Sequence, residues 1–220
     1  MRGSARLPVL GVLAVALAAG LGLVAAQHFW GSAPAPRSGT PAPALRGTLL
    51  YPQPRAVADF ALQRADGSAL TRADLLGHWT VLFIGFTHCP DVCPTTLGLL
   101  AEVTKRWPEA QQRPQVLFVA VDPERDTAEK AQEYASFFDP EFIGASGDLA
   151  ELEQFSRGFG MVFMKTALPD GGYTIDHSSS LSLIGPDATL RGVMRPPLQP
   201  DAITADLGAL MRAETGAETP

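Results

Sequence analysis

The chain has few cysteines and no excess of basic residues. Cys89 and Cys93 are the only thiols among 220 residues, so any thiol chemistry has to occur at one place. Lysine and arginine total 17 against 23 aspartates and glutamates, which gives a formal net charge of −6 at pH 7. This balance provides no basic stripe, so we expect no nucleic-acid partner and no attraction of the folded part to anionic membranes. The hydrophobic content of 46% suffices for one domain with appendages.

The amino terminus lacks charge over a long stretch. Arg2 and Arg6 precede residues 7–26, which carry no charged side chain, and about 20 apolar residues let a helix cross a bilayer. We therefore expect residues 1–30 to form an uncleaved membrane anchor; the alternative is a signal peptide cleaved after the small residues 24–26. Because arginines stay on the cytoplasmic side, the domain is expected outside. For a bacterium this predicts a single-pass protein of the inner membrane with its domain in the periplasm.

Composition divides the rest of the chain into three parts. Residues 31–47 are rich in proline, alanine and serine, which suits an extended linker and cannot form a core. Residues 48–212 carry the patterned apolar segments of a folded domain. Residues 213–220 are polar, and we expect them to form a flexible tail.

The domain alternates segments of strand and helix character. Apolar runs and turn signals predict a hairpin around residues 65–67 and strands at 80–86, 115–121, 141–146, 180–184 and 189–194. Apolar residues at helical spacing predict helices that begin near Pro94, Asp126, Asp148 and Asp201. Glu129 and Glu151 would complete capping boxes at the second and third of these. This order indicates an α/β sandwich with a mixed central sheet and an extra hairpin, and thiols after a central strand are typical of a thioredoxin-like fold.

The thiol pair lies at the corner between the strand 80–86 and the helix that follows. The spacing is Cys-x-x-x-Cys, one residue longer than the Cys-x-x-Cys of common thiol-disulfide oxidoreductases. Cys93 is expected at or just before the helix amino terminus, where the helix dipole favours a thiolate. Because thiolates are both nucleophiles and metal ligands, the pair could form a disulfide, exchange one, or bind a soft metal ion.

A metal site would need a third ligand besides the two thiols. Among the four histidines, His28 belongs to the anchor and is too distant, His78 lies in a polar turn, and the side chain of His88 diverges from that of neighbouring Cys89. His177 lies in a polar break before the last hairpin, where a lone histidine is more often structural than a ligand. Met161 and Met164 are soft donors, but their spacing favours packing in the core.

Three segments in order resemble those of one known family. Residues 86–94 read Phe-Thr-His-Cys-Pro-Asp-Val-Cys-Pro, residues 121–127 read Val-Asp-Pro-Glu-Arg-Asp-Thr, and residues 176–178 read Asp-His-Ser with Leu-Ile-Gly-Pro-Asp soon after. Together they resemble the SCO/SenC family of membrane-anchored copper proteins of cytochrome c oxidase assembly. The resemblance implies a thioredoxin-like domain with extra strands and assigns the metal ligands to Cys89, Cys93 and His177.

The donor chemistry agrees with one bound copper ion per chain, as Cu(I), Cu(II) or both. Soft thiolates select Cu(I) and imidazole suits copper, although Cys₂His with water is also a zinc pattern. Asp122 and Asp176 are candidates for a second shell that orients a ligand, beside plain roles as a loop cap and a turn residue.

The function implied by the resemblance is maturation of the dinuclear copper site of cytochrome c oxidase. Expected partners are the copper-bearing oxidase subunit and other periplasmic copper chaperones or thiol reductases. The alternative is a thiol-disulfide reductase, with Cys89 and Cys93 as its catalytic residues, that keeps the cysteines of a copper-accepting partner reduced. A peroxidase and a purely structural disulfide are weaker interpretations of the same corner.

Overall fold

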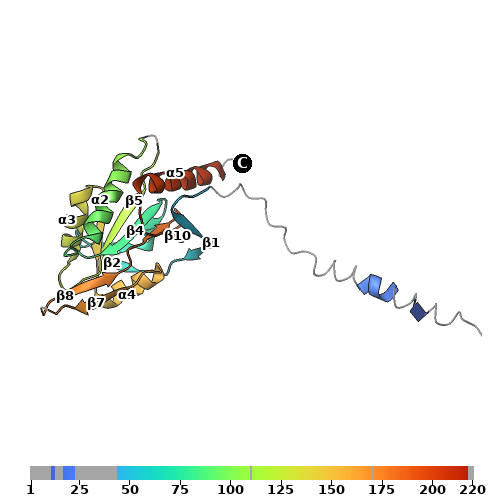
Figure 1. The fold of residues 1–220 in the computed structure, drawn as a ribbon, viewed down its shortest axis with the longest axis horizontal. Helices are drawn as coiled ribbons and strands as arrows, with labels where there is room; N and C mark the ends of the chain where they lie inside the picture. Colours follow the sequence, from blue (N-terminus) through green and yellow to red (C-terminus); the bar gives the residue numbers. More distant parts are fainter. Residues whose placement is uncertain (1–10, 13–16, 23–43, 110, 170, 218–220) are drawn as a thin grey trace, which may run out of the picture. The chain divides into compact units, whose positions relative to one another are not determined.

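The computed structural model describes residues 11–12, 17–22, 44–109, 111–169 and 171–217 (Figure 1). The chain separates into two units, 1–42 and 43–220, and each is described by itself. In the first unit the two described stretches are helical and exposed, and most of the predicted anchor lies outside the described residues. Among the residues described, no helix combines the length and apolar character needed to span a bilayer.

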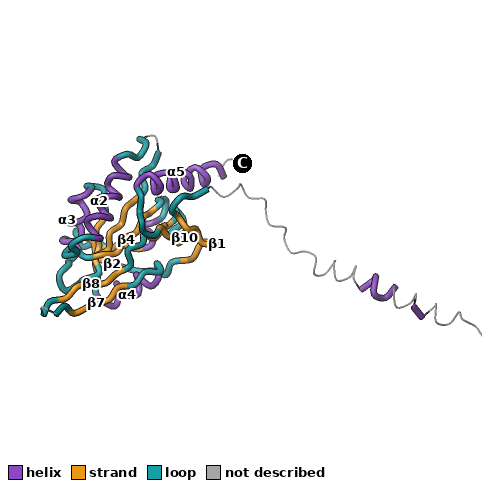
Figure 2. The backbone as a smooth tube through the Cα atoms, viewed as in Figure 1, coloured by secondary structure: helices purple, strands orange, loops and turns teal. Residues whose placement is uncertain are grey.

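The second unit is built on an eight-stranded sheet with the spatial order β1-β10-β9-β4-β5-β6-β2-β3. Figure 2 shows its strands in orange, among helices in purple. Its strands are β1 Thr48–Ala56, β2 Ala61–Arg64, β3 Ala69–Thr71, β4 Thr80–Gly85, β5 Gln115–Ala120, β6 Ile143–Ser146, β9 Leu181–Ile184 and β10 Thr189–Met194. β4, β5 and β6 pair in parallel, and the other pairs are antiparallel. The predicted mixed sheet is therefore confirmed, whereas β1 has no counterpart among the predicted strands.

The central strands are buried on both faces, as their near-continuous apolar sequences predict. All six residues of β4 and five of the six of β5 are buried. Alternation along β4 directs Phe83 and Gly85 toward one face, where the ring of Phe83 lies 6.3 Å from that of Phe118. Ser182 pairs with Leu82 and donates a hydrogen bond to the carbonyl of Phe159 on the opposite face.

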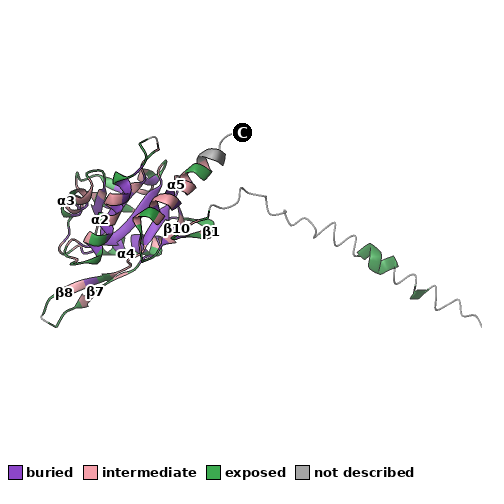
Figure 3. Ribbon diagram, turned by 45° about the horizontal axis from the view of Figure 1, so that its top comes forward, coloured by how far each residue is buried: buried purple, intermediate pink, exposed green. Residues whose placement is uncertain are grey.

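Helices cover both faces of this sheet. α2 Val92–Lys105 packs against α3 Ala128–Phe138 and α5 Pro200–Ala217 on one side. α4 Leu149–Gly158 lies on the other side (Figures 1 and 3). A 3₁₀ turn, η1 Arg72–Leu75, connects β3 to β4. The resulting layers form the thioredoxin-like α/β fold that the strand and helix order predicts.

Three helix starts test the predicted caps. Asp148 caps α4, and its reciprocal bonds with Glu151 form the predicted capping box. The prediction for α3 is wrong: Thr127 is the cap that accepts the hydrogen bond from Lys130, and Asp126 is buried instead. Pro94 is the third residue of α2 rather than its first, because the helix begins at Val92.

The last helix, α5, extends to Ala217, into the segment expected as a flexible tail.

A second, two-stranded sheet was not predicted. β7 Phe163–Ala167 and β8 Tyr173–His177 pair antiparallel and form a ribbon, hereafter the β7–β8 ribbon, beside the main sheet (Figure 3). The last residue of β8 is His177, so the segment read as a polar break is a strand. Sequence does not predict this strand because polar residues dominate it and Ile175 is the one buried residue of the ribbon.

Candidate metal centre

The two cysteines stand at the corner where β4 passes into α2. The loop after Gly85 turns back at the amide of Cys89, which donates to the carbonyl of Phe86 at 3.2 Å. Cys93, the second residue of α2, is fully buried, whereas Cys89 is partly exposed. The amide of Cys93 donates to Sγ of Cys89 at 3.4 Å. The helix terminus therefore directs one of its free N–H groups at a thiol, as expected for a site that favours negative sulfur.

Gly85 makes room for the buried thiol. A Cβ atom at this position would lie 2.6 Å from Sγ of Cys93 and 3.0 Å from Cε2 of Phe118. Both distances are below van der Waals contact, so a side chain here would displace the sulfur. The glycine lets the Cys93 sulfur pack directly against the end of the central strand.

The third side chain comes from a segment 84 residues further along the chain. His177, at the end of β8, places Nε2 3.4 Å from Sγ of Cys93. Its other nitrogen, Nδ1, lies 3.1 Å from the carbonyl oxygen of Ser178 and can meet it only as a donor. This bond fixes the tautomer that leaves the lone pair of Nε2 facing the thiols.

Aromatic rings and burial keep the imidazole in place and neutral. The rings of Phe83 and Phe86 lie 5.7 Å and 6.0 Å from the His177 ring, both edge to face. Burial lowers the pKa of His177, and this outweighs the raising effects of the Ser178 hydrogen bond and of the nearby Asp176 carboxylate. A neutral imidazole is the form that binds metal ions.

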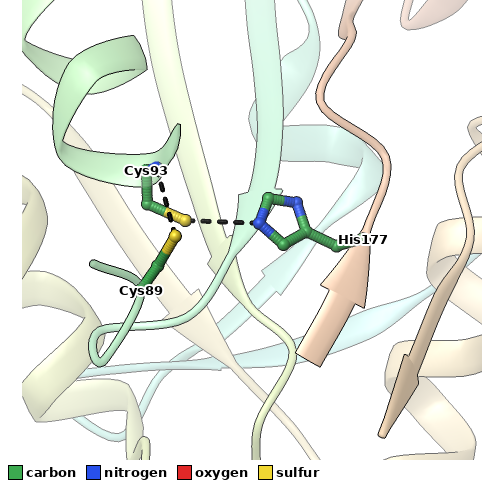
Figure 4. A group of neighbouring side chains, drawn as sticks. All are labelled: Cys89, Cys93 and His177. Carbon is green, nitrogen blue, oxygen red and sulfur yellow. Dashed lines mark hydrogen bonds between the residues drawn. The ribbon is translucent and has the colours of Figure 1, made fainter. Parts of the chain in front are cut away.

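The three side chains converge from three separate elements (Figure 4). One ligand atom from each, two sulfurs and one nitrogen, lies within 4.8 Å of the other two. Burial raises the pKa of the Cys93 thiol, so ionisation of this sulfur calls for a compensating positive charge. At Cys93 the cost of burying the charge therefore outweighs the support that the helix terminus is expected to give the thiolate. A soft metal cation fits the two sulfurs and one nitrogen as ligands, and it would also supply the positive charge that stabilises the Cys93 thiolate.

Asp126 supports the cysteine corner, a role that the sequence interpretation missed. Its fully buried carboxylate accepts hydrogen bonds from the amide of Thr87 at 2.7 Å and from the Thr87 hydroxyl at 2.5 Å. Nδ1 of His88 lies 3.7 Å from the same carboxylate. A usable signal existed: Asp126 follows β5, the parallel neighbour of β4, and carboxyl ends of parallel strands share one edge of a sheet.

The two aspartates expected behind the ligands have other contacts. Asp122 is buried, forms an ion pair with Arg125, and accepts a hydrogen bond from the Tyr173 hydroxyl at 3.1 Å. Asp176 is exposed and accepts a hydrogen bond from the Thr166 hydroxyl at 2.5 Å across the β7–β8 ribbon. Strand alternation places Asp176 and His177 on opposite faces of β8, so this bond stabilises the ribbon rather than the imidazole.

The remaining candidate donors lie apart from the three. His78 is half-buried with Nδ1 3.0 Å from the amide nitrogen of Gln112, and His28 lies outside the described residues. Met161 is 1% exposed, so its predicted core role is confirmed. The same prediction is wrong for Met164, which is 64% exposed on the β7–β8 ribbon.

Comparison with known proteins places this site in a family. The SCO1/SenC family model matches residues 50–212. The chain belongs to the SCO1/SenC family. One relative, from Stutzerimonas stutzeri, is provisionally named a copper-binding protein. It is 35% identical over 167 residues, which is 76% of this chain and 82% of that protein. The chain spans about half the length, or less, of mitochondrial SCO relatives that it matches.

Solved structures of SCO1/SenC relatives share the fold. Apo Sco1 from Thermus thermophilus is 35% identical, with a TM-score of 0.69 over 78% of this chain and 99% of that one. Arabidopsis thaliana ScoI with copper bound is 33% identical, with a TM-score of 0.65 over 73% of this chain and 98% of that one. The thioredoxin-like fold predicted from the element order is the fold of these SCO1/SenC proteins.

Proposed function

We propose that this protein binds one copper ion per chain through Cys89, Cys93 and His177 and acts in maturation of the dinuclear copper site of cytochrome c oxidase. The observation that carries the proposal is the convergence of the two sulfurs and one imidazole nitrogen within 4.8 Å. Copper is here the cargo of the protein. The support from relatives is that SCO1/SenC structures at 33% and 36% identity contain copper.

The donor set favours copper over zinc. Two thiolates and one imidazole satisfy three-coordinate Cu(I), whereas structural zinc takes four protein ligands. Cu(II) would need a further weak oxygen ligand. Zinc with a bound water remains the competitor that an experiment has to separate from copper.

The cellular setting is proposed from the amino-terminal sequence. Residues 1–30 would anchor the protein in the bacterial inner membrane, and the linker would hold the domain in the periplasm. The partners would be the copper-bearing oxidase subunit, periplasmic copper chaperones and the thiol reductases that keep the pair reduced. Because a Cys89–Cys93 disulfide would use both sulfurs, only the reduced protein can take up the ion.

Metal titration of the reduced full-length protein tests the proposal. We expect about one copper ion per chain and, with Cu(II), intense thiolate-to-copper charge-transfer absorption. Cys89→Ser, Cys93→Ser and His177→Ala should each abolish tight binding. His78→Ala is the matched control and should bind copper as the wild type does, because its contact with Gln112 is remote from the thiols. Unchanged Cu(I) affinity in His177→Ala would remove the imidazole from the ligand set.

The reductase alternative is less well supported. Disulfide exchange at Cys89 and Cys93 requires no imidazole 3.4 Å from the buried sulfur. The discriminating measurement is turnover of a disulfide substrate by metal-free protein. Sustained turnover in His177→Ala would favour the reductase over the copper protein.

A further inference from the structure

The strand that carries His177 is not paired with any described strand of the main sheet, although the imidazole packs on Phe83 of β4. The β7–β8 ribbon that carries it is a separate two-stranded sheet, hydrogen-bonded within itself. The cysteines, in contrast, are attached to the main sheet through β4 and α2. Because backbone pairing does not fix the ribbon on the sheet, side-chain contacts have to set the distance between the imidazole and the two sulfurs.

The loop between β5 and α3 is attached at one end to the cysteine corner. The amide of Val121 donates to the carbonyl of Gly85 at 2.8 Å. Further along the same loop, the carboxylate of Asp126 accepts both bonds from Thr87, two residues before Cys89. The loop is therefore hydrogen-bonded to the segment that carries the thiols at two points.

The same loop is attached to the β7–β8 ribbon through Arg125. The Arg125 guanidinium carbon lies 3.9 Å from the centroid of the Tyr173 ring, and Nη1 lies 3.4 Å from the Tyr173 carbonyl oxygen. The Tyr173 hydroxyl donates to Asp122, the ion-pair partner of Arg125. A second link joins Lys165 of β7 to Glu124 at 2.6 Å.

Arg125 also reaches the side of the site that carries the thiols. Its guanidinium carbon lies 5.6 Å from the Phe86 ring centroid, and Phe86 in turn packs edge to face on His177. Among the described residues, Nη2 of Arg125 is buried without a hydrogen-bond partner. The guanidinium therefore lies between the Tyr173 ring of the ribbon and the Phe86 ring beside the imidazole, and is in contact with both.

We propose that Arg125 is the positioning residue of the metal centre, which holds the β7–β8 ribbon so that Nε2 of His177 faces the two thiols. The inference rests on the proposed function of the same three ligands. Arg125 touches neither the ion nor a ligand atom; it acts through Tyr173 and Phe86. Its planar fork stacks on an aromatic ring while its N–H groups bond to a carboxylate and a carbonyl.

Substitution of Arg125 in the full-length protein tests this role with two readouts. In the metal-free protein, Arg125→Ala should lower the hydrogen-exchange protection of β8 amides about tenfold and shift the NMR signals of the His177 ring. With copper, it should weaken Cu(I) affinity by about tenfold to hundredfold, the usual effect of removing support behind a ligand, and change the Cu(II) charge-transfer spectrum. Arg125→Lys keeps the charge over the ring and should restore part of both properties.

Controls separate positioning from general destabilisation. Arg157→Ala removes an exposed pair with Glu153 and should change neither readout. Arg125→Ala combined with His177→Ala should bind Cu(I) no more weakly than His177→Ala alone, because the arginine acts through the imidazole. Additive losses, or unchanged protection and ring signals in Arg125→Ala, would overturn the inference. If the wild type bound no copper, the proposed function would fail, while the metal-free readouts would still decide the role of Arg125.

Discussion

Single side chains at the site are placed by steric room as much as by polar contacts. The buried sulfur of Cys93 lies where any side chain on Gly85 would stand, and the imidazole packs edge to face with two phenylalanine rings. The glycine is visible in the sequence, but nothing local shows that it faces a cysteine eight residues later. The prediction that Met164 packs in the core is likewise wrong because residue spacing does not tell which face of a ribbon is covered.

Gly85→Ala should weaken copper binding without unfolding the protein. The added methyl group would push Sγ of Cys93 away from its position, and overpacking of this kind destabilises by about 1–3 kcal/mol. Gly98→Ala is the matched control: it lies in the same helix as Cys93 with open space around it and should stabilise by up to about 1 kcal/mol. Urea denaturation and Cu(I) competition titration of both variants check the pair, and equal copper affinity would contradict the steric argument.

The loops between strands and helices contain residues for which the sequence predicts only a local role, such as capping the next helix. Asp126 and Asp148 each precede a helix and are followed three residues later by glutamate, so the same pattern predicted the same cap for both. In the structure the two aspartates have different roles: Asp148 caps its helix at the surface, whereas the carboxylate of Asp126 is buried and bonds to Thr87. A neighbouring threonine, Thr127, was free to take over the cap.

The two aspartates should respond differently to replacement by alanine. Asp148→Ala removes an exposed cap and should cost about 1 kcal/mol of unfolding free energy with unchanged copper affinity. Asp126→Ala leaves the amide of Thr87 without its acceptor and the Thr87 hydroxyl with Nδ1 of His88 as its remaining contact, so it should cost about 1–3 kcal/mol and also weaken Cu(I) binding. Chemical denaturation and copper titration measure both effects. Wild-type copper affinity in Asp126→Ala would show that the corner does not depend on this carboxylate.

At the scale of the whole domain, one buried carboxylate joins its two ends in sequence. Asp206 of α5, 1% exposed, accepts hydrogen bonds from the amides of Arg46, Gly47 and Thr48 and from the Thr48 hydroxyl, at 2.7–2.9 Å. Arg46 and Gly47 directly precede the edge strand β1, and Thr48 is its first residue. The contact attaches the first strand to the last helix.

Asp206→Ala should therefore be among the most destabilising changes away from the core. Removing the carboxylate leaves the buried amide and hydroxyl of Thr48 and the two partly buried amides without their acceptor, which should cost about 3 kcal/mol. Asp201→Ala in the same helix loses only an exposed ion pair with Arg106 and should cost less than about 1 kcal/mol. Urea denaturation of the two variants compares them directly, and similar losses would show that the Asp206 bonds contribute little net stability.

What the sequence by itself determined is local. The burial of β4 and β5, the capping box of α4, the hairpin of β9 with β10, and the thiol pair at the strand-to-helix corner all follow from residues close together in the chain. The resemblance to a known family added His177, which no local pattern marked as a ligand. Only the tertiary structure placed that imidazole against Cys93, because the contact spans 84 residues and depends on the β7–β8 ribbon, the Arg125 loop and the sheet order. Side chains distant in sequence meet only where packed elements bring them together, and a one-dimensional pattern does not contain that packing.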